Sequence, residues 1–513
     1  MSDTFYLTTA IDYANGEPHL GHAFEKIGAD CIARYRRLRG DTVHFLIGMD
    51  EHGQTVAQKA AERGLTPQQQ VDDIAPRFAA MWARLGISHD QFMRTASPAH
   101  HAGVTALLNR IFDKNPDDFY EHEYEGWYCV GCEAFKQPAE ITDGRCTLHA
   151  TRELQHTLER NWFFRLSKYR DRVLAHHERY PTFLAPDTRR NEIMALLNQG
   201  LEDISASRSR FTWGVPFPRP LSTGEQQTTY VWFDALPNYL TATGFPAAGY
   251  ERRWPAQLHI VGKDITRFHS VIWPAMLLAA ELPLPAQVWG HGFVLFKGEK
   301  FSKSAGVRLD LDDAVTRHGP DAFRYFLLRE IPWDADGGFS WDRFDARYRA
   351  ELADGWGNLQ SRVLAMIVRY LDGVVPAANP ASDLYQMGDQ VLAAYRDAMD
   401  HLLLHEGAAQ VWRLVDRANL YVEERQPWTQ AKRGDRNALQ ETLGTLAAAL
   451  ARIAALLFPF MPVKATEAWQ ALALDPAQLP RGWSLATEPT TVGKTVSRPA
   501  PLFPKLDPDI TKQ

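Results

Sequence analysis

Residues 4–53 read TFYLTTAIDYANGEPHLGHAFEKIGADCIARYRRLRGDTVHFLIGMDEHG, and this stretch decides the fold. Residues 4–10 are mostly β-branched and aromatic, as strands are. From Leu20 to Leu38 apolar residues recur at helical spacing, and residues 43–47 have the composition of a buried strand. A strand, a helix and a second strand in this order predict parallel strands joined by a right-handed crossover. Ligands of such sheets bind beyond the carboxyl ends of the strands, where residues 12–22 and 50–53 are expected to lie.

The rest of the chain divides by pattern into further segments. Helical spacing continues at 67–85 and 100–114, and strand-like runs resume at 228–233, 258–261 and 288–296. Between them, short strands, turns and a cysteine cluster predict an insertion into one α/β sheet. Ala- and Leu-rich amphipathic stretches at 351–372, 384–404, 407–425 and 435–457 predict a helical bundle. The expected division is a first sheet half at 1–115, an insertion at 116–225, a second sheet half at 226–305, a linking region at 306–350, the bundle at 351–487 and a loosely ordered tail at 488–513.

Composition excludes several classes of protein. With 513 residues the chain is too long for one core, while 45% hydrophobic and 23% charged residues are typical of a globular protein. A formal net charge of −6 argues against coating nucleic acid through bulk attraction. No apolar run approaches the roughly 20 residues that span a bilayer, and the N-terminus does not resemble a signal peptide. Four cysteines in this length predict a reducing, cytoplasmic setting and no membrane partner.

Two motifs point to phosphate chemistry. His19-Leu20-Gly21-His22 opens the first helix, where unpaired backbone amides favour phosphate and a glycine admits a nucleotide close to the backbone. Lys300-Phe301-Ser302-Lys303-Ser304 follows a predicted strand, and its lysines and hydroxyls could hold the charge that develops on a triphosphate. Either motif alone could be a capped helix or a solvated loop, but the pair in this order is specific. Neither of the common glycine-rich phosphate loops is present in the sequence.

Together these motifs resemble the class I aminoacyl-tRNA synthetases. The resemblance implies a Rossmann-like catalytic domain, activation of an amino acid with ATP and Mg²⁺, and transfer of the aminoacyl group to the 3′-terminal adenosine of tRNA. His19, His22, Lys300 and Lys303 would be the catalytic residues. The residues expected to bind ATP are His19, Gly21, His22, Arg208, Lys263, Asp264, Lys300, Ser302, Lys303 and Ser304.

A cysteine cluster in the insertion predicts a metal site. Cys129 and Cys132 form C-x₂-C, and Cys146 with His149 forms C-x₂-H, a spacing that suits tetrahedral Zn²⁺. Four protein ligands would close the coordination sphere, so the zinc is predicted to be structural. Reduced buried thiols, or a redox pair at Cys129 and Cys132, remain the alternatives. Cys31 lies on the apolar face of the first helix and is predicted to be core.

Further segments resemble methionyl-tRNA synthetases over nearly the whole chain. They are residues 13–16 (YANG), 50–53 (DEHG), 213–216 (WGVP), 230–235 (YVWFDA), 262–265 (GKDI) with Phe268 and His269, and 273–274 (WP). By this resemblance Asp50 would hold the substrate ammonium. The resemblance also implies a methionine pocket, where aromatic and aliphatic walls suit a polarizable thioether, made of Ile11, Tyr13, Trp232, Ala235, Leu236, Tyr239, Ile265 and His269.

In the helical region the resemblance implies recognition of the CAU anticodon of tRNA(Met). Asn358 and Arg362 lie one turn apart, and Trp428 follows a separate helix. Stacking on an aromatic ring and amide or guanidinium contacts to splayed bases are the usual means of recognising single-stranded RNA. Without the resemblance, a capping Asn and a packed Trp would be the simpler interpretation. The chain lacks the further C-terminal domain through which some relatives dimerise, so a monomer is expected.

The sequence departs from the family at three positions. Phe301 stands where Met is most common, Asp12 precedes Tyr13 where an uncharged residue is common, and His149 replaces the cysteine of some members. The alternatives are a cysteinyl-tRNA synthetase and a non-enzymatic zinc-knuckle RNA-binding protein. Clustered cysteines in the insertion argue against the first, since cysteinyl enzymes hold zinc in the active site. The second would not need His19, His22, Lys300 and Lys303 together.

Overall fold

The centre of the molecule is a parallel sheet. The computed structural model describes residues 4–129, 134–136, 141–147, 149–210, 212–296, 299–300 and 310–505. Within these residues a seven-stranded sheet has the order β11-β16-β15-β1-β3-β2, with β4 paired to β3, and every pairing is parallel. Its strands are β1 (Phe5–Thr9), β2 (Asp12–Tyr13), β3 (Val43–Asp50), β4 (Gln91–Arg94), β11 (Leu184–Ala185), β15 (Leu258–Gly262) and β16 (Val288–His291).

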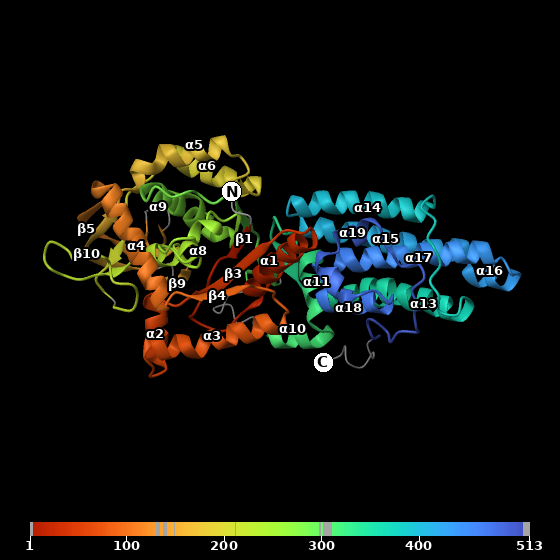
Figure 1. The fold of residues 1–513 in the computed structure, drawn as a ribbon. Helices are drawn as coiled ribbons and strands as arrows, with labels where there is room; N and C mark the ends of the chain where they lie inside the picture. Colours follow the sequence, from red (N-terminus) through yellow and green to blue (C-terminus); the bar gives the residue numbers. More distant parts are fainter. Residues whose placement is uncertain are drawn as a thin grey trace.

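The predicted β-α-β unit and the completion of the sheet by a distant segment are confirmed. Leu7 of β1 pairs with Phe45 of β3 on one side and with Leu258 of β15 on the other. Tyr6 and Leu7 are fully buried because helices cover both faces, which explains the continuous apolar run. The surrounding helices are α1 (Leu20–Leu38), α2 (Gln54–Glu62), α3 (Pro67–Arg84), α4 (Pro98–Lys114), α8 (Asn238–Thr241) and α9 (Trp273–Ala279), as Figure 1 shows.

Two of the predicted strands, 228–233 and 288–296, are not continuous strands in the structure. Residues 228–233 contain only the short β14 (Thr228–Thr229), and α7 (Val231–Ala235) follows at once. A short apolar run fits a strand or a buried helix equally well, and here contacts with the rest of the fold select the helix. The run 288–296 breaks at Gly292, where a Cβ would lie 2.0 Å from the carbonyl oxygen of Ala335. Beyond it, β17 (Val294–Phe296) leaves the main sheet and pairs with β18 (Glu299–Lys300) and β19 (Gly337–Phe339).

Residues 116–225 form an antiparallel hairpin with helices beside it. β5 (Phe119–Cys129) pairs with β10 (Gln155–Phe164) and β6 (Ala134–Lys136), and β10 pairs with β12 (Ile204–Ser205). A smaller sheet holds β7 (Ile141–Thr142), β8 (Arg145–Cys146) and β9 (His149–Glu153). The helices are α5 (Arg170–Arg179) and α6 (Asp187–Gln199), and between them β11 extends the main sheet. The region is therefore tied to the sheet at a second point.

The C-terminal part is a bundle of helices, as predicted. After α10 (Leu311–His318), α11 (Pro320–Glu330), α12 (Trp341–Arg347) and the π-helical Tyr348–Gly357 come α13 (Asn358–Tyr370), α14 (Asp383–Asp400), α15 (Leu404–Arg425), α16 (Pro427–Arg433), α17 (Arg436–Leu457), α18 (Pro462–Ala471) and α19 (Trp483–Thr487). The predicted looseness of the tail was wrong for its described part. Leu502 and Phe503 are buried, and Tyr348 donates to the carbonyl of Pro504 at 2.8 Å, because these apolar residues cover the bundle.

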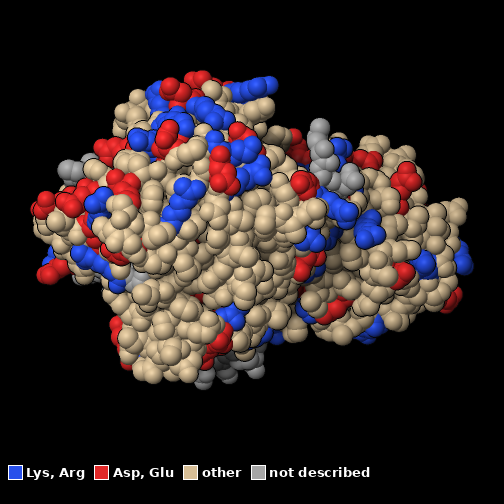
Figure 2. Space-filling model, turned by 60° about the vertical axis from the view of Figure 1, so that its left-hand side comes forward, with Lys and Arg blue, Asp and Glu red and all other residues tan. Residues whose placement is uncertain are grey.

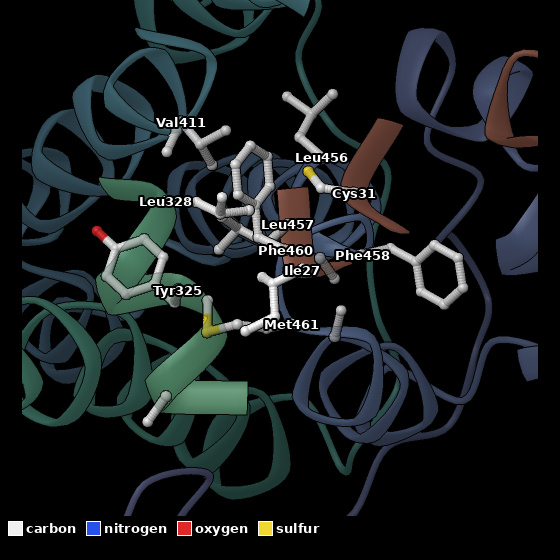
Figure 3. Packing of buried hydrophobic residues seen from close by; sticks show 14 of the residues in the cluster. Ile27, Cys31, Tyr325, Leu328, Val411, Leu456, Leu457, Phe458, Phe460 and Met461 are labelled. Atoms are coloured by element: carbon white, nitrogen blue, oxygen red, sulfur yellow. The ribbon is translucent and has the colours of Figure 1, made fainter. Parts of the chain in front are cut away.

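One core joins the sheet to the bundle. In Figure 3, Ile27 and Cys31 of α1 point toward Leu328 of α11 and toward residues at the end of α17. Cys31 is fully buried, as predicted. Arg324 of α11 is fully buried beside it and donates to Asp30 Oδ2 at 2.7 Å and to the carbonyls of Leu85, Pro459 and Phe460. The two parts of the molecule are thus held by apolar packing and by a buried ion pair.

The surface matches the near-neutral composition. Figure 2 shows acidic and basic side chains mixed around the edges of the face it views, with a broad central area of other residues. Among the described residues, no helix is both long and apolar enough to cross a bilayer.

Candidate active site

The first turn of α1 presents two histidines. His19 caps the helix: its Nδ1 accepts from the backbone amide of Gly21 at 3.1 Å, and its own amide donates to Nδ1 of His22 at 3.3 Å. The two rings stack with centroids 3.6 Å apart. Because both Nδ1 atoms accept, each neutral ring carries its hydrogen on Nε2, the tautomer that can donate to a phosphate oxygen. A Cβ on Gly21 would lie 3.1 Å from the His19 ring, so a larger residue would require that ring to shift.

The carboxyl edge of the sheet gathers the predicted ammonium ligand and part of the pocket. Asp50 ends β3 and lies opposite Tyr13 of β2, and its carbonyl accepts from Ala14 at 2.9 Å. Ile11 precedes β2, and its Cγ2 would lie 3.0 Å from a Cβ added at Gly48. Ile11, Tyr13 and Asp50 therefore lie near one another at this edge of the sheet.

Aromatic side chains form a second wall. Trp232 of α7 stacks on Phe268 with centroids 3.7 Å apart, and the rings of Trp232 and His269 are nearly perpendicular with centroids 6.3 Å apart. Tyr239 donates its hydroxyl to Nε2 of His269 at 2.7 Å, while Nδ1–H of His269 donates to the carbonyl of Ile265 at 2.9 Å. Burial lowers the pKa of His269 to about 4. The imidazole is therefore neutral near pH 7, in one fixed tautomer. Ala235 and Leu236 are buried beside this wall.

Asp12 lies beside a buried lysine and a second carboxylate. Lys26 of α1 is fully buried, and its Nζ lies 2.8 Å from Asp12 Oδ1, from Glu25 Oε1 and from the carbonyl of Ala10. Burial alone would lower the pKa of Lys26, but Asp12 and Glu25 raise it above its usual value. Oε2 of Glu25 also lies 3.1 Å from Nε2 of His291. Burial nevertheless raises the pKa of Asp12 to about 7, so Lys26 offsets only part of the cost of burying this carboxyl.

Residues expected to bind ATP come from strands of three different sheets. Lys263 and Asp264 follow β15, which pairs with β1, and Lys263 Nζ lies 2.7 Å from Asp336 Oδ2. Burial raises the pKa of Asp336, but Lys263 outweighs that and lowers it overall. Arg208 is buried on the short β13 (Ser207–Arg208), and its guanidinium lies 4.0 Å from the ring centroid of Tyr230, just before α7. Lys300 ends β18, and the motif residues Phe301, Ser302, Lys303 and Ser304 lie outside the described residues.

The cysteine cluster is described in part. Cys129, at the end of β5, and Cys146 of β8 are both fully buried, and His149 of β9 lies opposite Cys146 in the strand pairing. Cys132 lies outside the described residues. Within the described part of the chain, no group of three or more metal-binding side chains is assembled. Two buried thiols and a nearby histidine nevertheless have the donor chemistry that zinc prefers.

The predicted anticodon residues lie on neighbouring helices of the bundle. Asn358 begins α13 and Arg362 follows one turn later, and α13 contacts both α15 and α16. Arg362 Nη2 lies 2.6 Å from Glu423 Oε1 of α15. Trp428, in the first turn of α16, is 38% exposed, which is high for a tryptophan. Figure 1 shows α16 at the end of the bundle remote from the sheet.

Comparison with known proteins decides between the alternative functions considered for this chain. Over residues 5–151 and 132–364 the sequence matches the family described as "tRNA synthetases class I (M)", and over residues 375–513 it matches "Anticodon binding domain of methionyl tRNA ligase". The methionine–tRNA ligase of Caldanaerobacter subterraneus subsp. tengcongensis is 40% identical over 515 residues, covering 99% of this chain and 80% of the relative. The chain belongs to the methionine–tRNA ligase family. The Streptomyces coelicolor methionine–tRNA ligase is 39% identical, with 98% of this chain and 97% of the relative covered.

Solved structures of methionyl-tRNA synthetases agree. The Mycobacterium tuberculosis methionyl-tRNA synthetase in complex with methionyl-adenylate superposes with a TM-score of 0.93 at 38% identity, covering 98% of this chain and 100% of that chain. Its apo form superposes with a TM-score of 0.86 at 36% identity. Family membership confirms the predicted methionine–tRNA ligase activity over the cysteinyl and RNA-binding alternatives.

Sequence reasoning missed several residues of this methionine–tRNA ligase site. Phe268 stacks on Trp232; the sequence analysis named it only as part of a family segment and did not place it in the pocket. Lys26 could have been found from its place in the apolar pattern of α1, where a buried cation requires a partner. Asp336 had no local signal, because only the fold brings it to Lys263.

Proposed function

We propose that the edge of the sheet between β2, β3 and α7 binds L-methionine, which the chain activates with ATP. The observation that carries this assignment is the neutral His269–Tyr239 pair beside the face of Trp232, with a carboxylate, Asp50, at the strand end. A thioether is polarizable and nearly uncharged, so aromatic faces and a neutral imidazole suit it better than a charged group would. Asp50 supplies the negative charge that an ammonium requires. Ile11, Tyr13, Ala235, Leu236, Tyr239 and Ile265 would complete the pocket.

Activation is proposed to depend on positioning and charge neutralisation. A carboxylate oxygen of methionine attacks the α-phosphorus of ATP, and pyrophosphate leaves with its electron pair. His19 and His22 would donate from Nε2 to phosphate oxygens at the amino end of α1, supported by the tautomers derived above. Mg²⁺ and the lysines at 300 and 303 would balance the charge on the leaving pyrophosphate. Gly21, Ser302, Ser304, Arg208, Lys263 and Asp264 are the remaining proposed ATP contacts.

Transfer to tRNA is the second proposed half-reaction. A ribose hydroxyl of the 3′-terminal adenosine attacks the carbonyl carbon of methionyl-adenylate, and AMP leaves. Recognition of tRNA(Met) through its CAU anticodon is assigned to Asn358, Arg362 and Trp428, supported by the exposed indole and by the contact of α13 with α16. We propose a monomer that acts in the cytoplasm, where charged tRNA is consumed.

A structural zinc is proposed in the insertion. Cys129, Cys132, Cys146 and His149 would hold one Zn²⁺, supported by the burial of two thiols and by the register that sets His149 against Cys146. The ion would fold the tip of the insertion and take no part in the reaction. The division into domains at the boundaries predicted from the sequence stays part of this proposal.

The test is the variant Asp50→Asn, which keeps the shape of the side chain and removes its charge. We expect KM for methionine in ATP–pyrophosphate exchange to rise at least about 100-fold, since a charged hydrogen-bond partner is lost in a buried site. KM for ATP should change little. The control is Asp73→Asn, because Asp73 pairs with Arg63 and Arg77 on the exposed face of α3. An Asp50→Asn enzyme with unchanged KM for methionine would refute the assignment of the ammonium to Asp50.

A further inference from the structure

A buried carboxylate outside the proposed pocket joins three segments. Asp234 of α7 is 1% exposed. Its Oδ2 lies 2.6 Å from Nδ1 of His52, and its Oδ1 lies 2.9 Å from Nε2 of His100. Nδ1 of His100 in turn lies 2.9 Å from the hydroxyl oxygen of Thr241. A carboxylate so deeply buried is stable only when it is paired in this way.

The protonation of the cluster follows from its partners. Nε2 of His52 is buried and has no hydrogen-bond partner in the described part of the chain, so a hydrogen there would be left without an acceptor. The hydrogen of His52 therefore belongs on Nδ1, where it is donated to Asp234. Burial alone would raise the pKa of Asp234, but the two histidines hold it well below its usual value. The carboxylate is ionised and accepts from both rings.

The cluster connects the two walls of the methionine pocket. His52 follows Asp50 by two positions along the chain, and Asp234 follows Trp232 by two positions and directly precedes Ala235. The bond between His52 and Asp234 therefore ties the strand end that carries the ammonium ligand to the helix that carries the aromatic wall.

Hydrogen bonds hold the end of β3 rigidly, so the bond between His52 and Asp234 fixes the distance between the two walls of the pocket. The amide of Glu51 donates to Thr95 Oγ1 at 2.9 Å, its carbonyl accepts from Trp213 Nε1 at 2.6 Å, and its carboxylate accepts from Arg94 Nε at 2.6 Å. Gly53 has a φ of 108°, a conformation that favours glycine. His100 anchors the other side, because it lies in the first turn of the long helix α4.

We infer that Asp234 is a positioning residue that sets the spacing between Asp50 and the Trp232 wall, and thereby selects amino acids by side-chain length. This inference rests on the proposed pocket. A pocket distinguishes substrates that differ by one methylene by about 10- to 200-fold when its walls are fixed. Ethionine, which carries one methylene more than methionine, is the probe of that discrimination.

The test is Asp234→Ala in ATP–pyrophosphate exchange with methionine and with ethionine. We expect KM for methionine to rise about 10-fold or more and KM for ATP to change less than about 2-fold. The ratio of kcat/KM for methionine to that for ethionine should fall toward about one. Asp234→Asn keeps one acceptor oxygen and should recover part of the ratio. The control is Asp345→Asn, which breaks a similar pair with His318 (2.7 Å) away from the pocket and should leave the ratio unchanged.

The outcomes separate the possible failures. If Asp234→Ala folds and keeps the wild-type ratio of kcat/KM for methionine to that for ethionine, the inference is overturned. If KM for methionine and KM for ATP rise equally, Asp234 has only a structural role, which also overturns the inference. If Asp234→Ala does not fold, His52→Asn and His52→Leu replace it: Asn keeps a donor near the place of Nδ1 and should keep the ratio, whereas Leu should lose it. Equal ratios in those two variants also overturn the inference. Absence of methionine-dependent exchange in the wild-type enzyme would instead refute the proposed pocket itself.

Discussion

The hydrogen bond from Tyr239 to His269 allows a quantitative prediction for Tyr239→Phe. The ring of Tyr239 is 1% exposed and packs near His259 and Trp273, so phenylalanine should keep the packing and remove only the hydroxyl. Nε2 of His269 then loses its donor. In the empty pocket water can replace that donor, but a bound thioether would exclude the water. The cost of leaving a buried acceptor unsatisfied, about 1–3 kcal/mol, should therefore fall on the methionine complex.

This cost converts to a rise in KM for methionine of about 5- to 150-fold, since each 1.4 kcal/mol is about tenfold. KM for ATP should stay within about 2-fold. The assay is ATP–pyrophosphate exchange at saturating ATP over a range of methionine concentrations. The control is Tyr395→Phe, because Tyr395 is fully buried and donates to the carbonyl of Leu456 at 2.9 Å within the bundle. If Tyr239→Phe binds methionine as well as the wild type, the hydroxyl does not support the pocket and the reasoning fails.

Four further predictions follow from other parts of the structure. Trp428→Ala should impair tRNA charging while leaving exchange nearly intact, and parallel loss of both would contradict its place in anticodon recognition. Arg324→Met should lower the free energy of unfolding in urea by about 3 kcal/mol. The carbonyls that follow α17 lose their donor, whereas Asp30 keeps its ion pair with Arg34. An unchanged urea midpoint would contradict this. Burial lowers the pKa of His177 to about 4, so the unfolded chain binds the extra proton below pH 6.5 and stability rises with pH. His177→Gln should reduce that rise by at most about 2 kcal/mol between pH 5 and 7, and an unchanged slope would argue against it. Purified protein should contain about one zinc per chain, and Cys146→Ser should lose it; equal zinc in both would remove Cys146 from the ligand set.

The framework of the fold was predictable because its signals are local. The β-α-β unit at residues 4–53, the return of the sheet at Leu258 and the long helices of the bundle all follow from periodicity. The prediction failed where tertiary contacts decide. Residues 231–235 became α7 and not a strand, and Gly292 ended a strand because the chain near Ala335 passes too closely for any side chain.

The candidate site was predictable where residues are close in sequence or belong to a recognised motif. His19 and His22 needed only the helix start, and Asp50 only the strand end. The interactions that fix the site could not be predicted, because they join residues distant in the chain. His52 meets Asp234, and Lys263 meets Asp336, through the fold alone. The tautomer of His269 likewise depends on Tyr239 and on a backbone carbonyl, which no pattern reveals.

The central claim is that this pocket selects and activates methionine. Amino-acid-dependent exchange of pyrophosphate into ATP, measured with each of the twenty amino acids, tests it most directly. The account predicts strong exchange with methionine and little with any other amino acid. Exchange with cysteine but not methionine, or with none of the twenty, would contradict it.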